Sequence, residues 1–230
     1  MVEPQSQQQT QQQTQSQSHG FIIENDIREK CFGLEYENNN TDRHDIPKEK
    51  NKHDENENCS IKTTGSNTID CGDLLSFYGY DFDEKNTIIV YQYKQIDKDN
   101  KKLENIYEIN YNKECHKRLF GDISIDVLKE YVDFVKSIPK HINKDELKKY
   151  RDDYKKKKKE IQNKYKLKIN ISPKVDSKTQ RRVQCSIPKF QELLRDYIVY
   201  ESKTTHPEKP NMLRGEEIVL QFYSPKRVRK

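Results

Sequence analysis

Residues 164–171 read Lys-Tyr-Lys-Leu-Lys-Ile-Asn-Ile, so apolar and polar side chains alternate along this stretch. Such alternation is typical of a β-strand with one apolar and one polar face. A second alternating run follows at 183–187, beyond a polar loop. We expect the two runs to pair as a hairpin, whose polar face would be basic because it carries Lys164, Lys166 and Lys168.

A lysine-rich helix is expected to precede this hairpin. It begins near Lys144, has only a thin apolar stripe, and contains consecutive lysines at 155–159. Because convergent Lys and Arg side chains neutralise backbone phosphates, we expect residues 144–187 to bind nucleic acid, either DNA or RNA. The predicted phosphate-binding residues are Lys155, Lys156, Lys157, Lys158, Lys159, Lys164, Lys166, Lys168, Arg181 and Arg182.

The composition limits how much of the chain can pack into a core. Of the 230 residues, 31% are hydrophobic and 35% are charged, and the formal net charge is +5. Such a chain cannot form one close-packed globule, so part of it should be unstructured. The five cysteines are scattered and odd in number, as expected for free thiols. No apolar run is long enough to cross a bilayer and no signal peptide is evident, so we expect an intracellular protein without membrane contact.

Changes in composition along the chain predict its organisation. The first residues form a low-complexity Gln-rich tract that cannot offset the entropy of ordering. The predicted segments are a disordered tract at 1–20, a short apolar docking segment at 21–36, an acidic and polar linker at 37–68, a folded domain at 69–223 and a basic tail at 224–230.

Within the folded domain, the pattern predicts an α+β fold. Strands are expected at 87–94 and 106–111, which would form a first hairpin. A helix should run from Ser124 to Pro139, and a third should follow the basic hairpin. With a last strand at 217–223, these elements give an antiparallel or mixed sheet from two hairpins plus a C-terminal strand, packed by about three helices.

A metal-dependent nuclease is the one catalytic hypothesis that the residues suggest. Asp81 and Asp83 precede the strand at 87–94, and Lys94 ends it, so the two carboxylates could hold Mg²⁺ while the lysine steadies the attacking water. Gln92 stands where such sites use a charged residue, and this spacing arises easily in a chain rich in Asp and Lys. An ordinary exposed turn before a strand is the favoured interpretation.

Other chemistry finds no support in the sequence. There is no Cys-x-x-Cys pair, no glycine-rich phosphate loop and no arrangement of a nucleophile with a base. We therefore expect no cofactor, no metal, no small-molecule ligand and no catalytic residue. The sequence favours a non-enzymatic role over an enzymatic one.

The C-terminal residues 225–230 read Pro-Lys-Arg-Val-Arg-Lys, which is typical of a nuclear localisation signal. The residues that would form it are Lys226, Arg227, Arg229 and Lys230. Together these features predict a nuclear nucleic-acid-binding protein within a larger assembly that includes other protein subunits. One alternative is a protein-interaction or scaffold subunit of a nuclear complex that does not touch nucleic acid; another is a solvated lysine-rich face that binds nothing.

Overall fold

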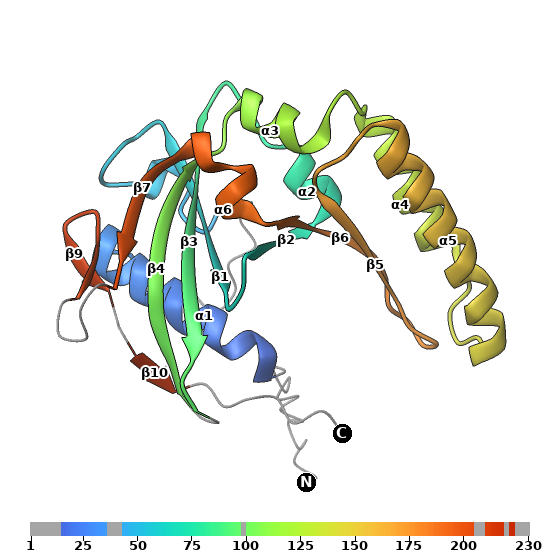
Figure 1. Cartoon of the computed structure of the whole chain (residues 1–230), viewed down its shortest axis with the longest axis horizontal. Helices are drawn as coiled ribbons and strands as arrows, with labels where there is room; N and C mark the ends of the chain where they lie inside the picture. Colours follow the sequence, from blue (N-terminus) through green and yellow to red (C-terminus); the bar gives the residue numbers. More distant parts are fainter. Residues whose placement is uncertain (1–14, 36–42, 98–99, 205–209, 219–220, 224–230) are drawn as a thin grey trace, which may run out of the picture.

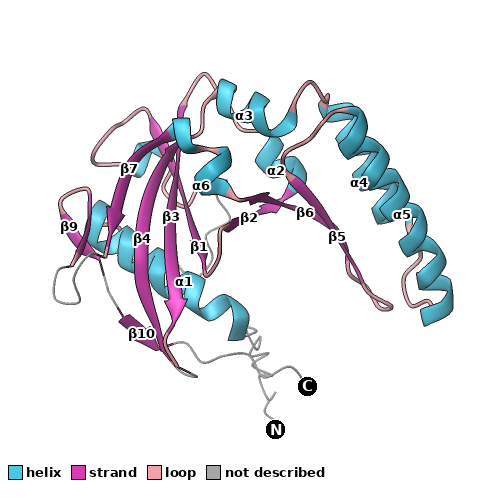
Figure 2. Cartoon of the chain, in the orientation of Figure 1, coloured by secondary structure: helices cyan, strands magenta, loops and turns pink. Residues whose placement is uncertain are grey.

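The computed structural model describes residues 15–35, 43–97, 100–204, 210–218 and 221–223, and the fold is α+β (Figure 1). The first 14 residues and the tail with the predicted localisation signal lie outside the described residues. A five-stranded mixed sheet, a three-stranded antiparallel sheet and a small two-stranded sheet are accompanied by short helices and by three longer ones (Figure 2). The fold class predicted from the sequence is therefore confirmed.

The larger sheet is built around β3 (Lys85–Gln95) and β4 (Asn100–Asn110), which pair antiparallel. This is the first predicted hairpin, with each strand longer than expected. On the far side of β3 lies β1 (Glu57–Thr64), which runs parallel to it. Two separate strands, β7 (Ile198–Lys203) and β10 (Gln221–Tyr223), pair with the other edge of β4.

The position of β1 corrects the prediction of a linker over 37–68. This strand offers few apolar side chains, and its buried polar ones are hydrogen-bonded: Asn58 to Glu84 (2.7 Å) and Ser60 to Tyr80 (2.9 Å). Buried polar groups of this kind are stable only when they have partners. Those partners lie about twenty or more residues away in the sequence. The composition of the segment alone therefore predicts a linker.

One face of the larger sheet is covered by α1 (Gln15–Ile27) and the π-helical turn that continues it, Arg28–Phe32. Ile23, Ile27 and Cys31, spaced by four residues, are fully buried in one hydrophobic cluster with side chains of β1, β3 and β4. The start of α1 overlaps the end of the tract predicted to be disordered at 1–20, of which residues 1–14 lie outside the described residues.

The other face packs onto the second sheet and the remaining helices. That sheet orders its strands as β2 (Thr68–Asp73), β6 (Arg181–Pro188) and β5 (Asn170–Val175). Its apolar side chains share one core with Ile88, Val90 and Tyr107 of the larger sheet. The helices of this half are α2 (Leu74–Tyr78), α3 (Lys113–Phe120), α4 (Ile125–Ser137) and α5 (Lys144–Lys164).

The predicted strand at 164–171 is wrong in its first part, because α5 extends to Lys164 and β5 begins only at Asn170. The Leu167 amide donates to Gln162 O (3.1 Å), the Lys166 amide donates to Asn163 O (3.4 Å), and Lys166 is left-handed (φ 51°). These are the features of a Schellman motif, which ends a helix. The amides of Lys168 and Ile169 then bond to Leu119 O instead of β6.

A glycine is required where this connection passes α3. Gly121 has a positive φ of 60°, and a Cβ atom there would lie 2.6 Å from Tyr165 O. The close backbone approach fixes the end of α5 against the end of α3. The alternating residues 164–169 therefore form the end of α5 and a connection held against α3, not a strand.

The C-terminal part is more broken than expected. The predicted third helix is only α6 (Phe190–Leu193) and a 3₁₀ turn (Arg195–Tyr197), after which the chain forms β7. The expected last strand is divided into β9 (Glu216–Ile218), which pairs with β8 (Asn211–Leu213), and β10.

Candidate nucleic-acid interface

The helix α5 has well-formed ends and one apolar stripe. Asn143 caps it, with its side chain accepting from the amides of Asp145 (3.0 Å) and Glu146 (2.9 Å). Leu147 and Tyr154 are buried, and Tyr131 of α4 donates to Tyr154 O (3.1 Å). The apolar side of α5 is thus occupied by the core, which leaves the remaining faces to solvent.

The charges of α5 are segregated around the helix. It carries ten Lys or Arg and five Asp or Glu. Successive residues of an α-helix are rotated by about 100° around its axis. On this basis one row of cations lies within an arc of about 80° around the axis of α5 and extends for about 22 Å along it. We call this row the basic stripe; its residues, all exposed, are Lys144, Lys148, Arg151, Lys155 and Lys159.

The acidic residues of α5 lie on a different face. Measured from Lys144, they fall between about 80° and about 200° around the helix, where they alternate with Lys149 and Lys156. Each of these two lysines has a carboxylate four residues before and four residues after it, a spacing at which opposite charges attract on a helix surface. We call this the mixed face. The acidic residues are Asp145, Glu146, Asp152, Asp153 and Glu160.

The basic stripe borders the β5–β6 hairpin. Lys158, next to the stripe, donates to Asn170 Oδ1 of β5 (3.0 Å), and burial lowers the pKa of its ammonium group. Asn170 lies on the polar side of the hairpin, where Lys174 pairs across the strands with Arg182. Lys174 is half-buried and Arg182 is exposed, so the hairpin extends the positive surface beyond the helix.

The other end of the hairpin is anchored by Arg181, whose guanidinium is buried. It donates to Ile138 O (2.9 Å), to Asp176 O (2.7 Å) and to Pro139 O, which joins the hairpin tip to the connection between α4 and α5. Arg181 has the same strand parity as Val183 and therefore points to the core. The prediction that Arg181 contributes to an exposed phosphate-binding surface is therefore wrong.

The other predicted residues are distributed as follows. Lys155 and Lys159 lie on the basic stripe, whereas Lys156 lies on the mixed face. Lys157 packs over the Phe134 ring of α4 (4.7 Å to its centre). Lys164, Lys166 and Lys168 are exposed, but at the helix end and in the connection, not along a strand.

Four further cations of this surface were not among the predicted phosphate-binding residues: Lys144, Lys148, Arg151 and Lys174. For the three on α5, the helical period of the charges was the available signal, since they recur three or four residues apart. For Lys174, the signal would have been its pairing with Arg182, which depends on the register of the hairpin.

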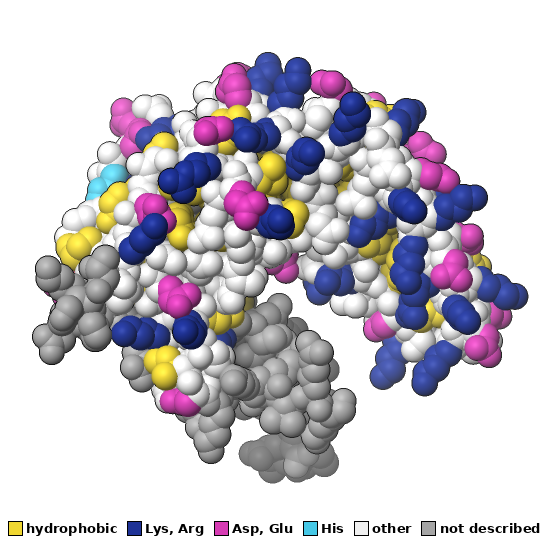
Figure 3. Space-filling model, in the orientation of Figure 1, with side chains coloured by type: hydrophobic (Ala, Val, Ile, Leu, Met, Phe, Trp, Pro, Cys, Tyr) yellow, Lys and Arg dark blue, Asp and Glu magenta, His cyan; other side chains and the backbone are white. Residues whose placement is uncertain are grey.

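The cations of α5 have no ion-pair partner in the part of the chain that the structure describes. Among the described residues, none of them has a carboxylate oxygen within 4.0 Å, whereas most ion pairs belong to the half built on the larger sheet. Figure 3 shows Lys and Arg side chains gathered over the end of the molecule that carries α4, α5 and the β5–β6 hairpin. This surface has the unpaired charge that an anionic partner requires.

The residues of the nuclease hypothesis do not converge. Asp81 and Asp83 form a turn before β3, with Asp81 Oδ1 accepting from the Asp83 amide (2.9 Å), whereas Lys94 lies at the opposite end of the strand. At about 3.3 Å per residue, the lysine is about 30 Å from the start of β3. Within the described ranges, no group of three or more His, Cys, Asp or Glu side chains is placed to hold a metal ion.

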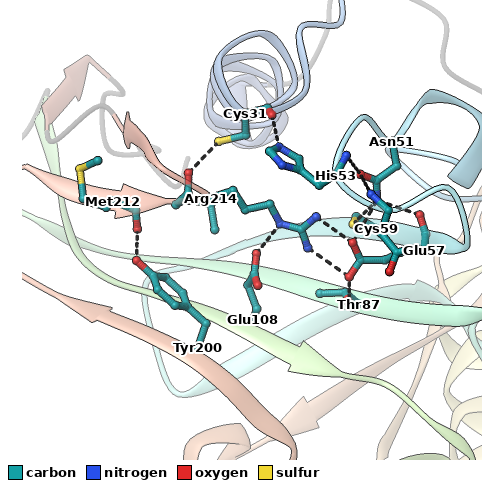
Figure 4. A network of polar contacts seen from close by, with 12 residues as sticks. Cys31, Asn51, His53, Glu57, Cys59, Thr87, Glu108, Tyr200, Met212 and Arg214 are labelled. Carbon is teal, nitrogen blue, oxygen red and sulfur yellow. Dashed lines mark hydrogen bonds and ion pairs between the residues drawn. The ribbon is translucent and has the colours of Figure 1, made fainter.

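A second polar site lies on the larger sheet (Figure 4). Arg214, which lies in the turn between β8 and β9, contacts two carboxylates of that sheet. Its Nη1 atom is 2.7 Å from Glu57 Oε2, and its Nε atom is 2.7 Å from Glu108 Oε1. Thr87 donates to Glu57 Oε1 (2.6 Å) and Asn51 to Glu57 Oε2 (3.0 Å). Burial alone raises the pKa of Glu57, but the hydrogen bonds from Arg214 and Thr87 outweigh it and hold that pKa at about 2.

Part of the wall of a pocket of about 520 Å³ is formed by Glu57, Thr87, Glu108 and Arg214. The carboxylate of Glu57 is saturated by its protein partners, and Arg214 is engaged on both sides, so neither is free for a ligand. Arg214 also has a positive φ of 52°, followed by Gly215 at 89°, as a tight hairpin turn requires. We interpret this network as a device that holds the β8–β9 hairpin to the sheet.

No helix in the described part of the chain has the length and apolarity needed to cross a membrane. Comparisons with known proteins do not extend these observations, since no family model, no curated protein and no solved structure matches the chain. The function is therefore inferred from the residues of the chain itself.

Proposed function

We propose that this protein binds nucleic acid through the basic stripe of α5 and the adjoining polar side of the β5–β6 hairpin. The observation that carries the proposal is the segregation of charge on α5: one face holds exposed cations that have no ion-pair partner among the described residues, and every carboxylate of the helix lies on another face. Like charges repel on a helix, so this arrangement costs stability in the free protein. An anionic partner removes that cost.

Phosphate groups suit the arrangement because their negative charge repeats at short intervals. Neighbouring cations of the stripe are separated by about 4.5–6 Å along the helix axis, so several phosphates can be approached at once. Each neutralised phosphate releases bound counterions, and this term supplies most of the affinity in sequence-independent binding. The protein would therefore act as a non-enzymatic binding subunit; nuclear residence and membership of a larger assembly remain predictions.

A protein-interaction role is the second candidate, and one observation favours it. Phe21 and Ile22 are adjacent on α1 and expose 40% and 44% of their surface, although α1 is otherwise docked through its apolar side. Such a pair could contact another protein subunit. Because apolar contacts are little weakened by salt, this role predicts binding of a protein partner that persists at high ionic strength.

The test uses two double variants whose substituted positions differ by one residue along α5. Lys148→Gln with Lys155→Gln removes two charges from the basic stripe, and Lys149→Gln with Lys156→Gln removes two from the mixed face. All four lysines are exposed. We expect the stripe variant to bind a fluorescein-labelled 20-base-pair duplex about tenfold more weakly in an anisotropy titration, since two phosphate contacts are lost.

The mixed-face variant is the matched control, because it loses the same net charge from the same helix. Its affinity should stay close to that of the unaltered protein. Equal losses in both variants would mean that net charge alone attracts the nucleic acid, and undetectable binding of the unaltered protein in low salt would dismiss the proposal.

A further inference from the structure

Among the described residues, the basic surface has no well-exposed aromatic side chain on which single-stranded bases could stack. On α4, α5 and the connection that follows α5, the aromatic residues that are not fully buried are Phe134, Tyr150 and Tyr165, and each is partly buried and packed against the core. Phe134 is in addition covered by the ammonium group of Lys157. Among the described residues, the exposed large apolar side chains all lie on other elements: Phe21, Ile22, Ile96, Val199 and Met212.

This absence matters because the two forms of nucleic acid are held by different interactions. Proteins that bind single strands combine a positive groove with aromatic platforms, and each stacked base contributes about 1–3 kcal/mol. A flexible strand also loses conformational entropy when it is held straight. Without stacking, the lysines alone would have to offset that loss.

The rigidity of the basic stripe points the same way. Its cations stand on a single helix whose two ends are fixed, by the Asn143 cap and by the Schellman motif at Lys166. A duplex is likewise stiff, with a persistence length of about 150 base pairs. A stripe of about 22 Å corresponds to about six base pairs at about 3.4 Å per step. The charges and the phosphates are then both pre-arranged, so little ordering is required of either partner.

We infer that the ligand of this surface is a double-stranded nucleic acid, bound through its backbone, and not a single strand. The inference rests on the proposed function. DNA and RNA duplexes present the same phosphate chemistry, so the surface does not select between them by charge alone.

The experiment is an anisotropy competition with the full-length chain at one fixed salt concentration. A labelled 20-base-pair DNA duplex is displaced by unlabelled DNA duplex, by RNA duplex of the same sequence, and by each of the separated DNA strands. The strands are designed without self-complementarity and are compared at equal nucleotide concentration. We expect at least one duplex to compete about tenfold better than either single strand. We also expect the Lys148→Gln and Lys155→Gln variant to lose most of this preference.

The possible failures are distinguishable. If single strands compete as well as or better than both duplexes while the stripe variant still binds more weakly than the mixed-face variant, the duplex inference is overturned and the proposed function stands. If the two variants bind alike, the proposed function itself fails. A preference for either the DNA duplex or the RNA duplex supports the inference, and it identifies which of the two is the better ligand.

Discussion

Arg214 and Lys155 are both cations on the surface of the fold, yet they have opposite surroundings. The Arg214 side chain is 11% exposed and lies between two carboxylates on the larger sheet. Lys155 is exposed and, among the described residues, has no acidic partner. The first cation contributes to stability through its partners, whereas the second stabilises no described carboxylate and is repelled by its neighbours on the basic stripe. This difference separates charge that holds the fold from charge that is available to a ligand.

The largest effect should come from removing Arg214. Arg214→Met leaves the buried carboxylate of Glu57 without its main partner, and breaking a buried ion pair costs about 3–5 kcal/mol. We expect the free energy of unfolding, measured by urea titration at neutral pH, to fall by that amount. A loss of less than about 1 kcal/mol would show that the network does not hold the fold.

The same network predicts a dependence of stability on pH. The pKa of Glu57 is held at about 2, below its usual 4.5, so its contribution is full above about pH 4.5 and is lost as the pH falls towards 2. At about 1.4 kcal/mol for each pKa unit, this amounts to about 3.5 kcal/mol. Unfolding free energies of the unaltered protein and of Glu57→Gln, measured between pH 7 and pH 2.5, should converge as the pH falls. A constant difference would contradict the assignment.

A smaller effect is expected at the end of α5. Lys166 has a left-handed conformation (φ 51°), which glycine adopts without the steric cost that other residues incur. Lys166→Gly should therefore stabilise the protein by about 0.5–1 kcal/mol in urea unfolding. A destabilisation would mean that the lysine side chain has a structural role in the connection to β5.

The smallest effect is expected where the charges are free. Lys148→Gln with Lys155→Gln removes no ion pair seen among the described residues, so the free energy of unfolding should change by less than about 0.5 kcal/mol for each site. Thermal melting in parallel with Arg214→Met provides the comparison. A loss approaching that of Arg214→Met would place these lysines among the groups that hold the fold.

Parts of this architecture could be predicted because local signals agree with the global packing. The strands around Ile88 and Ile109 have strong β-character, and α4 is bounded by Ser124 and Pro139. The buried position of Arg181 follows from its strand parity with Val183, whereas its charge alone predicts an exposed phosphate-binding residue. Arginine reaches backbone carbonyl oxygens readily, so a charged residue on a core-facing position can serve the fold.

Other parts could not be predicted because they depend on distant contacts. The alternation at 164–169 resembles a strand until the amides of Lys168 and Ile169 are found to bond with Leu119 O on α3. Likewise, β1 is recognisable only together with β3, which supplies its backbone partners. The basic stripe, by contrast, follows from the helical period once the extent of α5 is known.

The salt dependence of duplex binding tests most directly whether the stripe lysines contact phosphates. The logarithm of the association constant is measured against the logarithm of salt concentration for the unaltered protein and for both paired variants. Each phosphate contact contributes about −0.9 to the slope, so the stripe variant should have a slope shallower by about 2 and the mixed-face variant an unchanged one. Identical slopes for the unaltered protein and the stripe variant would show that Lys148 and Lys155 do not touch the nucleic acid.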